Sequence, residues 1–194
     1  MATTYTSPFP SLPIPKTNFL TYLYPPNTTA SSTPLWIDAS DPRKILSPRQ
    51  ALSWIRRLAA GLRLDALNIP KSSVILIFTP NHIFVPVAYQ GIVGSGRIFC
   101  GVILVHPSLV GIAVKAAGGV GLSRDRIFLF SDDATAGLHC SDFPDVSNWK
   151  RMVASEAKGA AWKWDELSGE SITSSSAAST IATVNYSSGT HIIT

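Results

Sequence analysis

The feature that most restricts the fold is a series of short, uninterrupted apolar runs. The clearest are residues 74–78 (VILIF), 102–105 (VILV) and 126–130 (RIFLF), with helix-like stretches between them. Strands buried on both faces of a parallel sheet have this continuous pattern, whereas half-exposed strands alternate apolar and polar residues. The order of elements therefore predicts a layered α/β fold with a mainly parallel sheet, in which strand 74–78 is fully buried.

A helix that begins after Ser47 is the best-marked element. Ser47 can cap it, Pro48 suits its first position, and Gln50 completes a capping box. Just before it, residues 36–38 and 44–46 predict a short hairpin. The helix is expected to bury one apolar face, made of Leu52, Ile55, Ala59 and Leu62.

Two further helices are predicted. Pro86 requires that the first starts near Val85 or is kinked, and Asn81 is a candidate cap. Gly94-Ser95-Gly96 ends this helix, and because it follows a helix rather than a strand it is not interpreted as a dinucleotide loop. The second helix follows Pro107-Ser108, and is expected to bury Leu109, Ile112, Ala113 and Ala116 and to close at Gly118-Gly119.

The chain divides into three parts. Residues 1–34 are rich in Pro, Ser and Thr and are expected to be extended, because their prolines oppose regular helix. Residues 35–190 form the folded domain, and residues 191–194 form a short tail.

The second half of the domain is less regular. Residues 131–170 are interpreted as a surface excursion with a short helix near 148–157. The small polar residues at 168–180 predict a flexible linker within the domain, and a strand at 180–186 follows it.

Composition narrows the possible functions. The net charge is +4, but the basic residues are scattered, so no nucleic-acid partner is expected. No apolar stretch approaches the ~20 residues of a membrane span, and the beginning of the chain lacks the order of a secretory signal. With no peroxisomal signal at its end, the chain is interpreted as intracellular, and cytoplasmic by default.

Metal binding is not predicted. Cys100 and Cys140 are too few for a metal cluster or a disulfide framework and are interpreted as free thiols. The four histidines show no ligand spacing, so no metal-binding residue is assigned. The Walker A pattern and the G-x-S-x-G elbow are both absent from the sequence, and no catalytic residue is assigned either.

The candidate binding residues are Ser187, Ser188, Gly189 and Thr190, which follow the strand predicted at 180–186. Glycine frees backbone N–H groups to point at phosphate oxygens, and hydroxyl groups add further donors. Taken alone, a Ser/Gly loop after a strand is also a common structural turn, so spacing leaves both interpretations open.

Several stretches together resemble the adenylate-forming (AMP-binding) enzymes, in particular acyl-CoA synthetases and fungal 4-coumarate-CoA-ligase-like proteins. TVNYSSGT is similar to the first half of their phosphate loop, and SSVILIFTPNHIFVPVAYQGIVGSGRIF and ILVHPSLVGIAVKAAGGVGLSRDRIFLFSD are similar to their N-terminal domain. The resemblance implies that a carboxylic acid is activated with ATP to an acyl-adenylate and then transferred to coenzyme A. It also implies ATP, Mg²⁺ and coenzyme A as cofactors, and Ser187, Ser188, Gly189 and Thr190 as phosphate contacts.

Two departures from the family pattern stand out. Residues 191–194 (HIIT) replace the remainder of the loop, which in the family continues to Gly-x-Pro-Lys-Gly. The family also places a loop and a helix between the strands that match RIF and VILV, whereas here only Cys100-Gly101 joins them. A parallel crossover needs about a dozen residues. We therefore expect an N-terminal portion of the family domain with an internal deletion.

Three functional interpretations follow. The first is a truncated acyl-CoA-ligase-like chain that acts on no carboxylic acid and binds no cofactor productively by itself. The second is a non-catalytic interaction module derived from such an enzyme, with no identifiable protein partner. The third is an unrelated small nucleotide-binding enzyme. A sheet that lacks strands exposes edges and apolar surface, so we also expect poor solubility or a molten chain.

Overall fold

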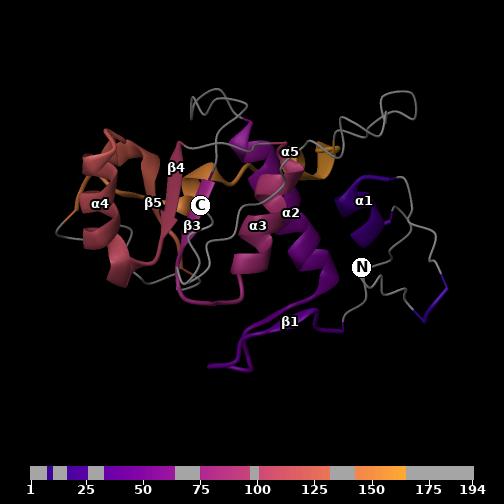
Figure 1. Ribbon diagram of the computed structural model, residues 1–194. Helices are drawn as coiled ribbons and strands as arrows, with labels where there is room; N and C mark the ends of the chain where they lie inside the picture. The colour runs from indigo at the N-terminus through magenta and orange to yellow at the C-terminus, as the bar shows by residue number, and fades with distance from the viewer. Residues whose placement is uncertain are drawn as a thin grey trace, which may run out of the picture.

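The computed structural model describes residues 8–10, 17–25, 33–63, 75–96, 101–131 and 143–164. A parallel sheet lies in the middle, with helix α4 (Val110–Gly119) on one face and helices α2 (Pro48–Leu62) and α3 (Val85–Gly94) on the other (Figure 1). The predicted α/β fold with a parallel sheet is confirmed.

The sheet has four strands that stand in the order of the chain. Each strand pairs in parallel with its predecessor, and Ile75 lies opposite Val102 while Ile103 lies opposite Ile127. The strands are β3 (Ile75–Phe78), β4 (Val102–Val105), β5 (Ile127–Leu129) and β6 (Ser147–Asn148).

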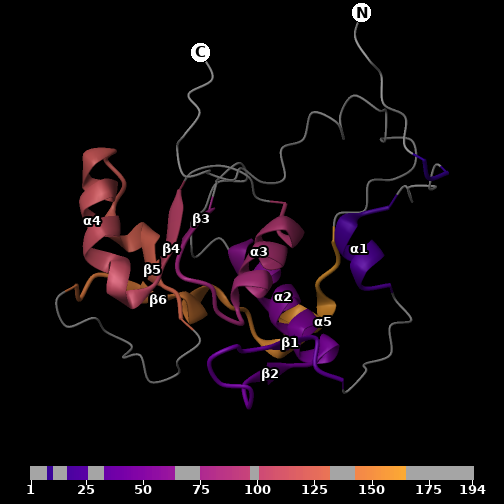
Figure 2. The same cartoon turned by 60° about the horizontal axis from the view of Figure 1, so that its bottom comes forward.

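Strand β4 shows how its two faces are covered. Val102 and Leu104 belong to the core cluster that contains Leu58 of α2 and Ala88 of α3. Ile103 and Val105 belong to a second cluster with α4. Because successive side chains of a strand point to opposite faces, α3 and α4 lie on opposite sides of the sheet (Figure 2).

Strand β3 is less buried than predicted. Leu76 keeps 40% of its surface exposed, although its neighbour Ile75 is buried. Ile75 and Ile77 face α2 and α3, whereas Phe78 belongs to the side of α4. The expectation of a strand buried on both faces is therefore wrong at Leu76, because α4 covers β4 and β5 but leaves β3 open.

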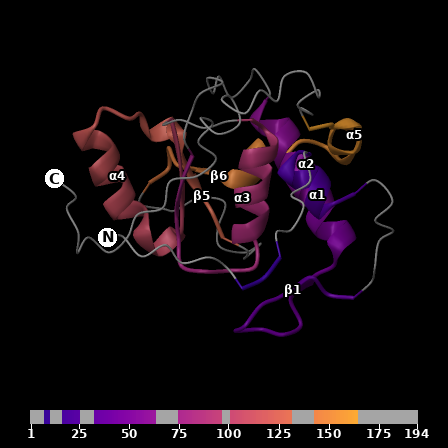
Figure 3. The ribbon, with the colours of Figure 1, turned by 45° about the vertical axis from the view of Figure 1, so that its right-hand side comes forward.

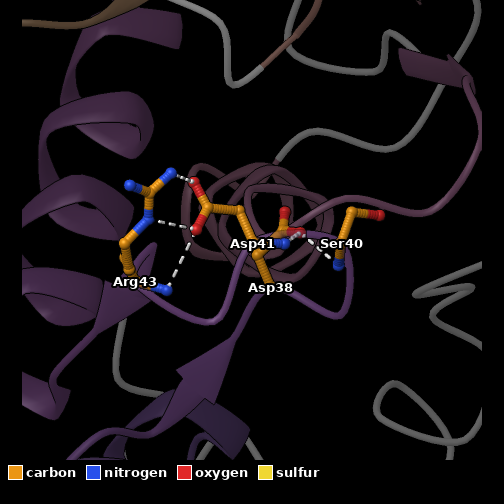
Figure 4. A network of polar contacts seen from close by, with 4 residues as sticks. All are labelled: Asp38, Ser40, Asp41 and Arg43. Atoms are coloured by element: carbon orange, nitrogen blue, oxygen red, sulfur yellow. Dashed lines mark hydrogen bonds and ion pairs between the residues drawn. The ribbon is translucent and has the colours of Figure 1, made fainter.

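The predicted hairpin is present as β1 (Trp36–Ile37) and β2 (Ile45–Leu46), paired antiparallel. Figure 4 shows how its turn is held: Arg43 makes two hydrogen bonds to the Asp41 carboxylate, at 2.8 and 3.1 Å. The carboxylate of Asp38 accepts hydrogen bonds from the backbone N–H groups of Ser40 and Asp41. The hydrogen bonds from Arg43 lower the pKa of the Asp41 carboxyl group.

Helix α2 begins as predicted. The Ser47 hydroxyl accepts the Gln50 N–H at 3.3 Å, and the Gln50 side chain accepts the Ser47 N–H at 2.9 Å, so the capping box is complete. The predicted apolar face is confirmed for its last three members, and Leu52 is half-buried. The buried residues are Ala51, Ile55, Leu58, Ala59, Ala60, Gly61 and Leu62.

Helix α3 starts at Val85, with Pro86 in its first turn, as Pro86 required. Asn81 does not cap it: the preceding residue is Phe84, and no side chain makes a capping hydrogen bond. The helix ends at Gly94, and Gly96 follows with a φ of 65°, a conformation that favours glycine. The interpretation of Gly94-Ser95-Gly96 as a helix end is confirmed.

Helix α4 ends at Gly119 as predicted, but it buries only part of the predicted face. Val110, Ala113 and Ala117 are buried and Leu109 packs partly buried beside them, whereas Ile112 is 60% exposed and Ala116 is exposed. The prediction is confirmed at Ala113 and wrong at Ile112 and Ala116, because the helix is apolar almost all round and periodicity alone cannot select a side.

The expectation of an extended N-terminal segment is wrong for α1 (Phe19–Leu23). This five-residue helix lies between Pro15 and Pro25, and the Asn18 side chain accepts the Leu20 N–H at 2.8 Å. Leu20 and Tyr24 are buried against α2 and α3, so tertiary packing stabilises a helix too short to form alone.

The expected surface excursion of residues 131–170 is wrong for the part that the structure describes after residue 131, residues 143–164. Residues 143–164 contain β6, the 3₁₀ turn η4 (Trp149–Met152) and α5 (Glu156–Ala161). Trp149 has no exposed surface and packs edge-on against Phe130, and its Nε1–H donates to the Ser131 carbonyl at 3.2 Å. Residue 149 therefore belongs to the core.

Helix α5 lies beside α2 (Figure 3), and η4 and the segment after it contact α2 directly. Gly61 of α2 lies directly against the Met152 carbonyl, where a Cβ atom would collide. At the far end of the segment, Trp164 and Leu20 both pack on Gly94, where an added Cβ atom would lie 2.8 and 2.7 Å from them. The first described helix and the last described residue thus meet on one glycine of α3.

Candidate functional site

The predicted site lies outside the described residues. This holds for Ser187, Ser188, Gly189 and Thr190, for the linker and the strand predicted before them, and for Cys100 and Cys140. Their placement and their role as phosphate contacts therefore stay predictions. Within the described residues, the candidate site is the edge of the sheet where the parallel strands end.

The carboxyl ends of β3, β4 and β5 lie side by side at this edge, where α/β proteins commonly bind ligands. Two hydrogen bonds tie the loops to the neighbouring strands. The His106 N–H donates to the Phe78 carbonyl at 3.1 Å, and the Phe130 N–H donates to the Val105 carbonyl at 2.7 Å. The edge is therefore a fixed platform rather than a set of separate loops.

His106 and Ser108 are hydrogen-bonded to each other at this edge. The Ser108 hydroxyl lies 2.8 Å from His106 Nδ1, and the Ser108 backbone N–H donates to the same nitrogen at 3.3 Å. His106 caps the 3₁₀ turn η2 (Pro107–Leu109) by accepting the Ser108 N–H, which is a structural use of its side chain.

The loop after β3 uses its polar groups in the same way. The Thr79 hydroxyl donates to the Pro80 carbonyl at 3.0 Å, and His82 Nδ1 accepts the Phe84 N–H at 3.4 Å. The His82 ring also lies 4.6 Å from the Phe130 ring. Helix α3 then opens with Pro86, which has no N–H to offer a phosphate. These side chains hold the loop and are not arranged as an anion site.

The described residues lack two kinds of feature. They contain no group of three or more His, Cys, Asp or Glu side chains placed to hold a metal ion. None of their helices is both long enough and apolar enough to cross a membrane.

The sequence predicts a helix that follows Pro107-Ser108, and it assigns no role to His106. The available signal was the turn of residues 106–108 (HPS) directly after a buried strand, which places side chains at a carboxyl edge. The backbone N–H groups at this edge donate hydrogen bonds that orient the loops after β4 and β5. The phosphate chemistry predicted from the sequence depends on residues 187–190.

Comparisons with known proteins give the decisive observation. An acyl-CoA ligase, azaF, and a phenylacetyl-CoA ligase, epaB, both from Aspergillus niger, are each 26% identical over 153 residues. The chain is similar to fungal acyl-CoA ligases. An acyl-CoA synthetase of Alternaria alternata, ACTT5, is 28% identical over 114 residues, which are 48% of this chain and 19% of that protein. The resemblance predicted from the sequence is confirmed.

The similarity covers only part of the relatives. It includes 66% of this chain, and the chain spans about 28% of the length of azaF and epaB. A crystal structure of coronafacic acid ligase from Pectobacterium brasiliense aligns with 63% of this chain and 25% of its own, at 15% identity and a TM-score of 0.43. No protein-family model matches the chain.

Proposed function

We propose that the chain carries the front portion of an ATP-dependent acyl-CoA ligase of the adenylate-forming family. In that reaction a carboxylate oxygen attacks the α-phosphate of ATP, which forms an acyl-adenylate and releases pyrophosphate. The sulfur of coenzyme A then attacks the acyl carbon, which forms a thioester and releases AMP. The observation that carries the proposal is the similarity to three fungal proteins named as acyl-CoA ligases or synthetases.

The proposed site is the loop Ser187, Ser188, Gly189 and Thr190. Backbone N–H groups around Gly189 and the three hydroxyl groups would donate hydrogen bonds to the phosphates of Mg²⁺-bound ATP. Mg²⁺ would offset the charge of the triphosphate and the leaving pyrophosphate. The sheet would hold the strand that leads into this loop.

We also propose that the loop, as residues 187–194 read, does not support the reaction. After Thr190 the sequence reads His191-Ile192-Ile193-Thr194, where the related loops, by the resemblance, read a second threonine or serine and then Gly-x-Pro. The related loops, by the resemblance, continue to a lysine that can donate a charged hydrogen bond to the triphosphate. Such hydrogen bonds contribute about 1.5–3 kcal/mol, which corresponds to about tenfold or more in affinity.

The test compares three versions of the full chain by calorimetric titration with Mg-ATP. In one variant residues 191–194 are replaced by Thr-Gly-Gly-Pro-Lys-Gly, and its matched control has methionine in place of that lysine. The lysine variant is expected to bind Mg-ATP at least about tenfold more tightly than the control. Equal affinity of the two variants would contradict the assignment of residues 187–190 to the triphosphate.

A second assay measures phenylacetate-dependent exchange of pyrophosphate into ATP. The unmodified chain is expected to show none, and exchange above background would refute the proposed inactivity. Two other results would support different functions. Micromolar ATP binding by the unmodified chain that Gly189→Trp abolishes would support a separate nucleotide-binding enzyme. Specific capture of one protein partner, with no nucleotide binding by either variant, would support an interaction module.

A further inference from the structure

Two segments that are far apart in the sequence share one packing site on α2 and α3. Leu20 of α1 has no exposed surface, Trp164 is 9% exposed, and both belong to the same core cluster. An added Cβ atom at Gly94 would lie 2.7 Å from Leu20 and 2.8 Å from Trp164, so the two side chains lie side by side over the end of α3. Each of them therefore covers part of the other.

Trp164 is the largest buried side chain of the segment of residues 155–164. Within this segment only Gly159 and Trp164 are buried, Trp162 is half-buried, and the other side chains are exposed. The guanidinium of Arg56 stacks over the Trp164 ring, 5.6 Å from its centre. Helix α5 has six residues, which is too short for a helix to be stable without tertiary contacts. The segment therefore depends on the site where Trp164 packs.

Helix α1 depends on equally few side chains. Leu20 and the C-cap residue Tyr24 are buried, whereas the other apolar side chains of α1 are 40–61% exposed. The Tyr24 hydroxyl donates a hydrogen bond to the Gln90 side chain at 2.9 Å, which joins the end of α1 to α3. A helix of five residues is not stable by itself, so α1 depends on the contact that Leu20 makes beside Trp164.

We propose that α1 and residues 155–164 dock and open as one cooperative unit, which links the N-terminal part of the chain to the part beyond Trp164. Loss of either segment exposes the buried side chain of the other to water, and a coupling free energy of this kind acts equally in both directions. Displacement of α1 then releases Trp164, from which the chain leads on to residues 187–190. The coupling is independent of the proposed function, and only its effect on the candidate loop rests on that function.

The first test measures hydrogen exchange of the unmodified full chain at increasing urea concentrations. The amide of Tyr24 is hydrogen-bonded within α1, those of Gly159 and Trp162 within the second segment, and that of Phe130 between strands of the sheet. The first three are expected to share one opening free energy and one urea dependence, and to open at least about tenfold more often than the Phe130 amide. Different opening free energies for the two segments would overturn the proposal, and so would opening no more frequent than that of Phe130.

Substitutions in the full chain test whether the coupling acts in both directions. Leu20→Ala is expected to raise the exchange rates of the Gly159 and Trp162 amides about tenfold or more, because alanine leaves one side of Trp164 uncovered. Trp164→Ala is expected to raise the exchange rate of the Tyr24 amide by a similar factor, because Leu20 then loses its neighbour.

The matched controls are exposed neighbours of the two substituted residues. Leu23→Ala changes a 40% exposed side chain of α1, and Lys163→Ala changes an exposed side chain next to Trp164. Each control is expected to leave the exchange rates of the other segment within about twofold of those of the unmodified chain. If Leu20→Ala raised exchange only within α1, or Trp164→Ala only within residues 155–164, the two segments would open separately and the proposal would be wrong.

Discussion

Arg57 and Ala154 exchange two hydrogen bonds, although Arg57 lies within α2 and Ala154 precedes α5. The Ala154 N–H donates to the Arg57 carbonyl at 3.0 Å, and Arg57 Nε donates to the Ala154 carbonyl at 2.9 Å. The guanidinium of Arg57 also lies 4.7 Å from the centre of the Trp54 ring. This pairing holds the segment after η4 directly on the backbone of α2.

The close approach of that segment makes Gly61 a sensitive position. Gly61→Ala would place a Cβ atom on the Met152 carbonyl, so either α2 or the segment must move. We expect a loss of about 1–3 kcal/mol in the free energy of unfolding, as for an overpacked core. Urea denaturation followed by circular dichroism measures it. The control is Gly118→Ala in α4, where nothing lies within 4 Å of the added atom and a helix-favouring gain is expected.

Trp149 is expected to contribute more than any surface tryptophan. It has no exposed surface and contacts the rings of Trp54, Phe84 and Phe130. Trp149→Ala removes these contacts and leaves a cavity, so we expect a loss of about 3–5 kcal/mol in the free energy of unfolding. Val120→Ala, at a side chain that is 81% exposed, should change it by less than about 0.5 kcal/mol. Similar effects of the two substitutions would contradict the core position of Trp149.

The capping box of α2 can be tested separately. Ser47→Ala leaves the Gln50 N–H without its side-chain acceptor, and we expect a loss of about 1 kcal/mol in the free energy of unfolding. Ser53 is exposed within the same helix, and Ser53→Ala is expected to be neutral or slightly stabilising, because alanine favours helix. Chemical denaturation of the two variants in parallel distinguishes the cap from a general effect of losing serine.

The buried phenol of Tyr24 makes the stability of the fold depend on pH in the alkaline range. Burial raises the pKa of its phenol above the ordinary value, and the phenol donates a 2.9 Å hydrogen bond to Gln90. Above a pH of about 10 the unfolded chain loses this proton while the folded chain keeps it, so stability falls as pH rises. The contribution is fully present below that pH. Tyr24→Phe should show a shallower fall in urea midpoint above pH 10, and an unchanged slope would contradict the buried phenol.

Elements with strong local signals were predicted correctly. Ser47, Pro48 and Gln50 define the start of α2 by hydrogen bonds between near neighbours, which a sequence displays directly. Pro86 and the glycines at 94 and 96 mark the ends of α3 for the same reason. The apolar runs gave β4 and β5, whose faces are both covered. Local chemistry was sufficient at these positions.

The wrong predictions concern positions that distant residues determine. Helix α1 forms because Leu20 packs beside Trp164 in the core. Trp149 is buried because β6, which precedes it, joins the sheet after a long connection. Leu76 is exposed because α4 packs on β4 and β5 and does not reach β3. None of these relationships leaves a periodic pattern in the sequence near the residue concerned.

The candidate site also has a part that was predicted from a local motif and a part that depends on distant residues. The loop of residues 187–190 was predicted from a motif and its family resemblance, and it lies outside the described residues. The edge that holds His106 and Ser108 was not predicted as a unit, because its members come from strands that only the sheet topology brings together.

The meeting of Leu20 and Trp164 on Gly94 has a consequence for synthesis of the chain. Leu20 leaves the ribosome early, and its partner is translated only after the whole sheet. At about 5–20 residues per second, α1 waits on the order of ten seconds or more before its contact surface is complete. During that interval the exposed apolar side chains of the nascent N-terminus are available to chaperones, and the contact of Leu20 with Trp164 is among the last to form.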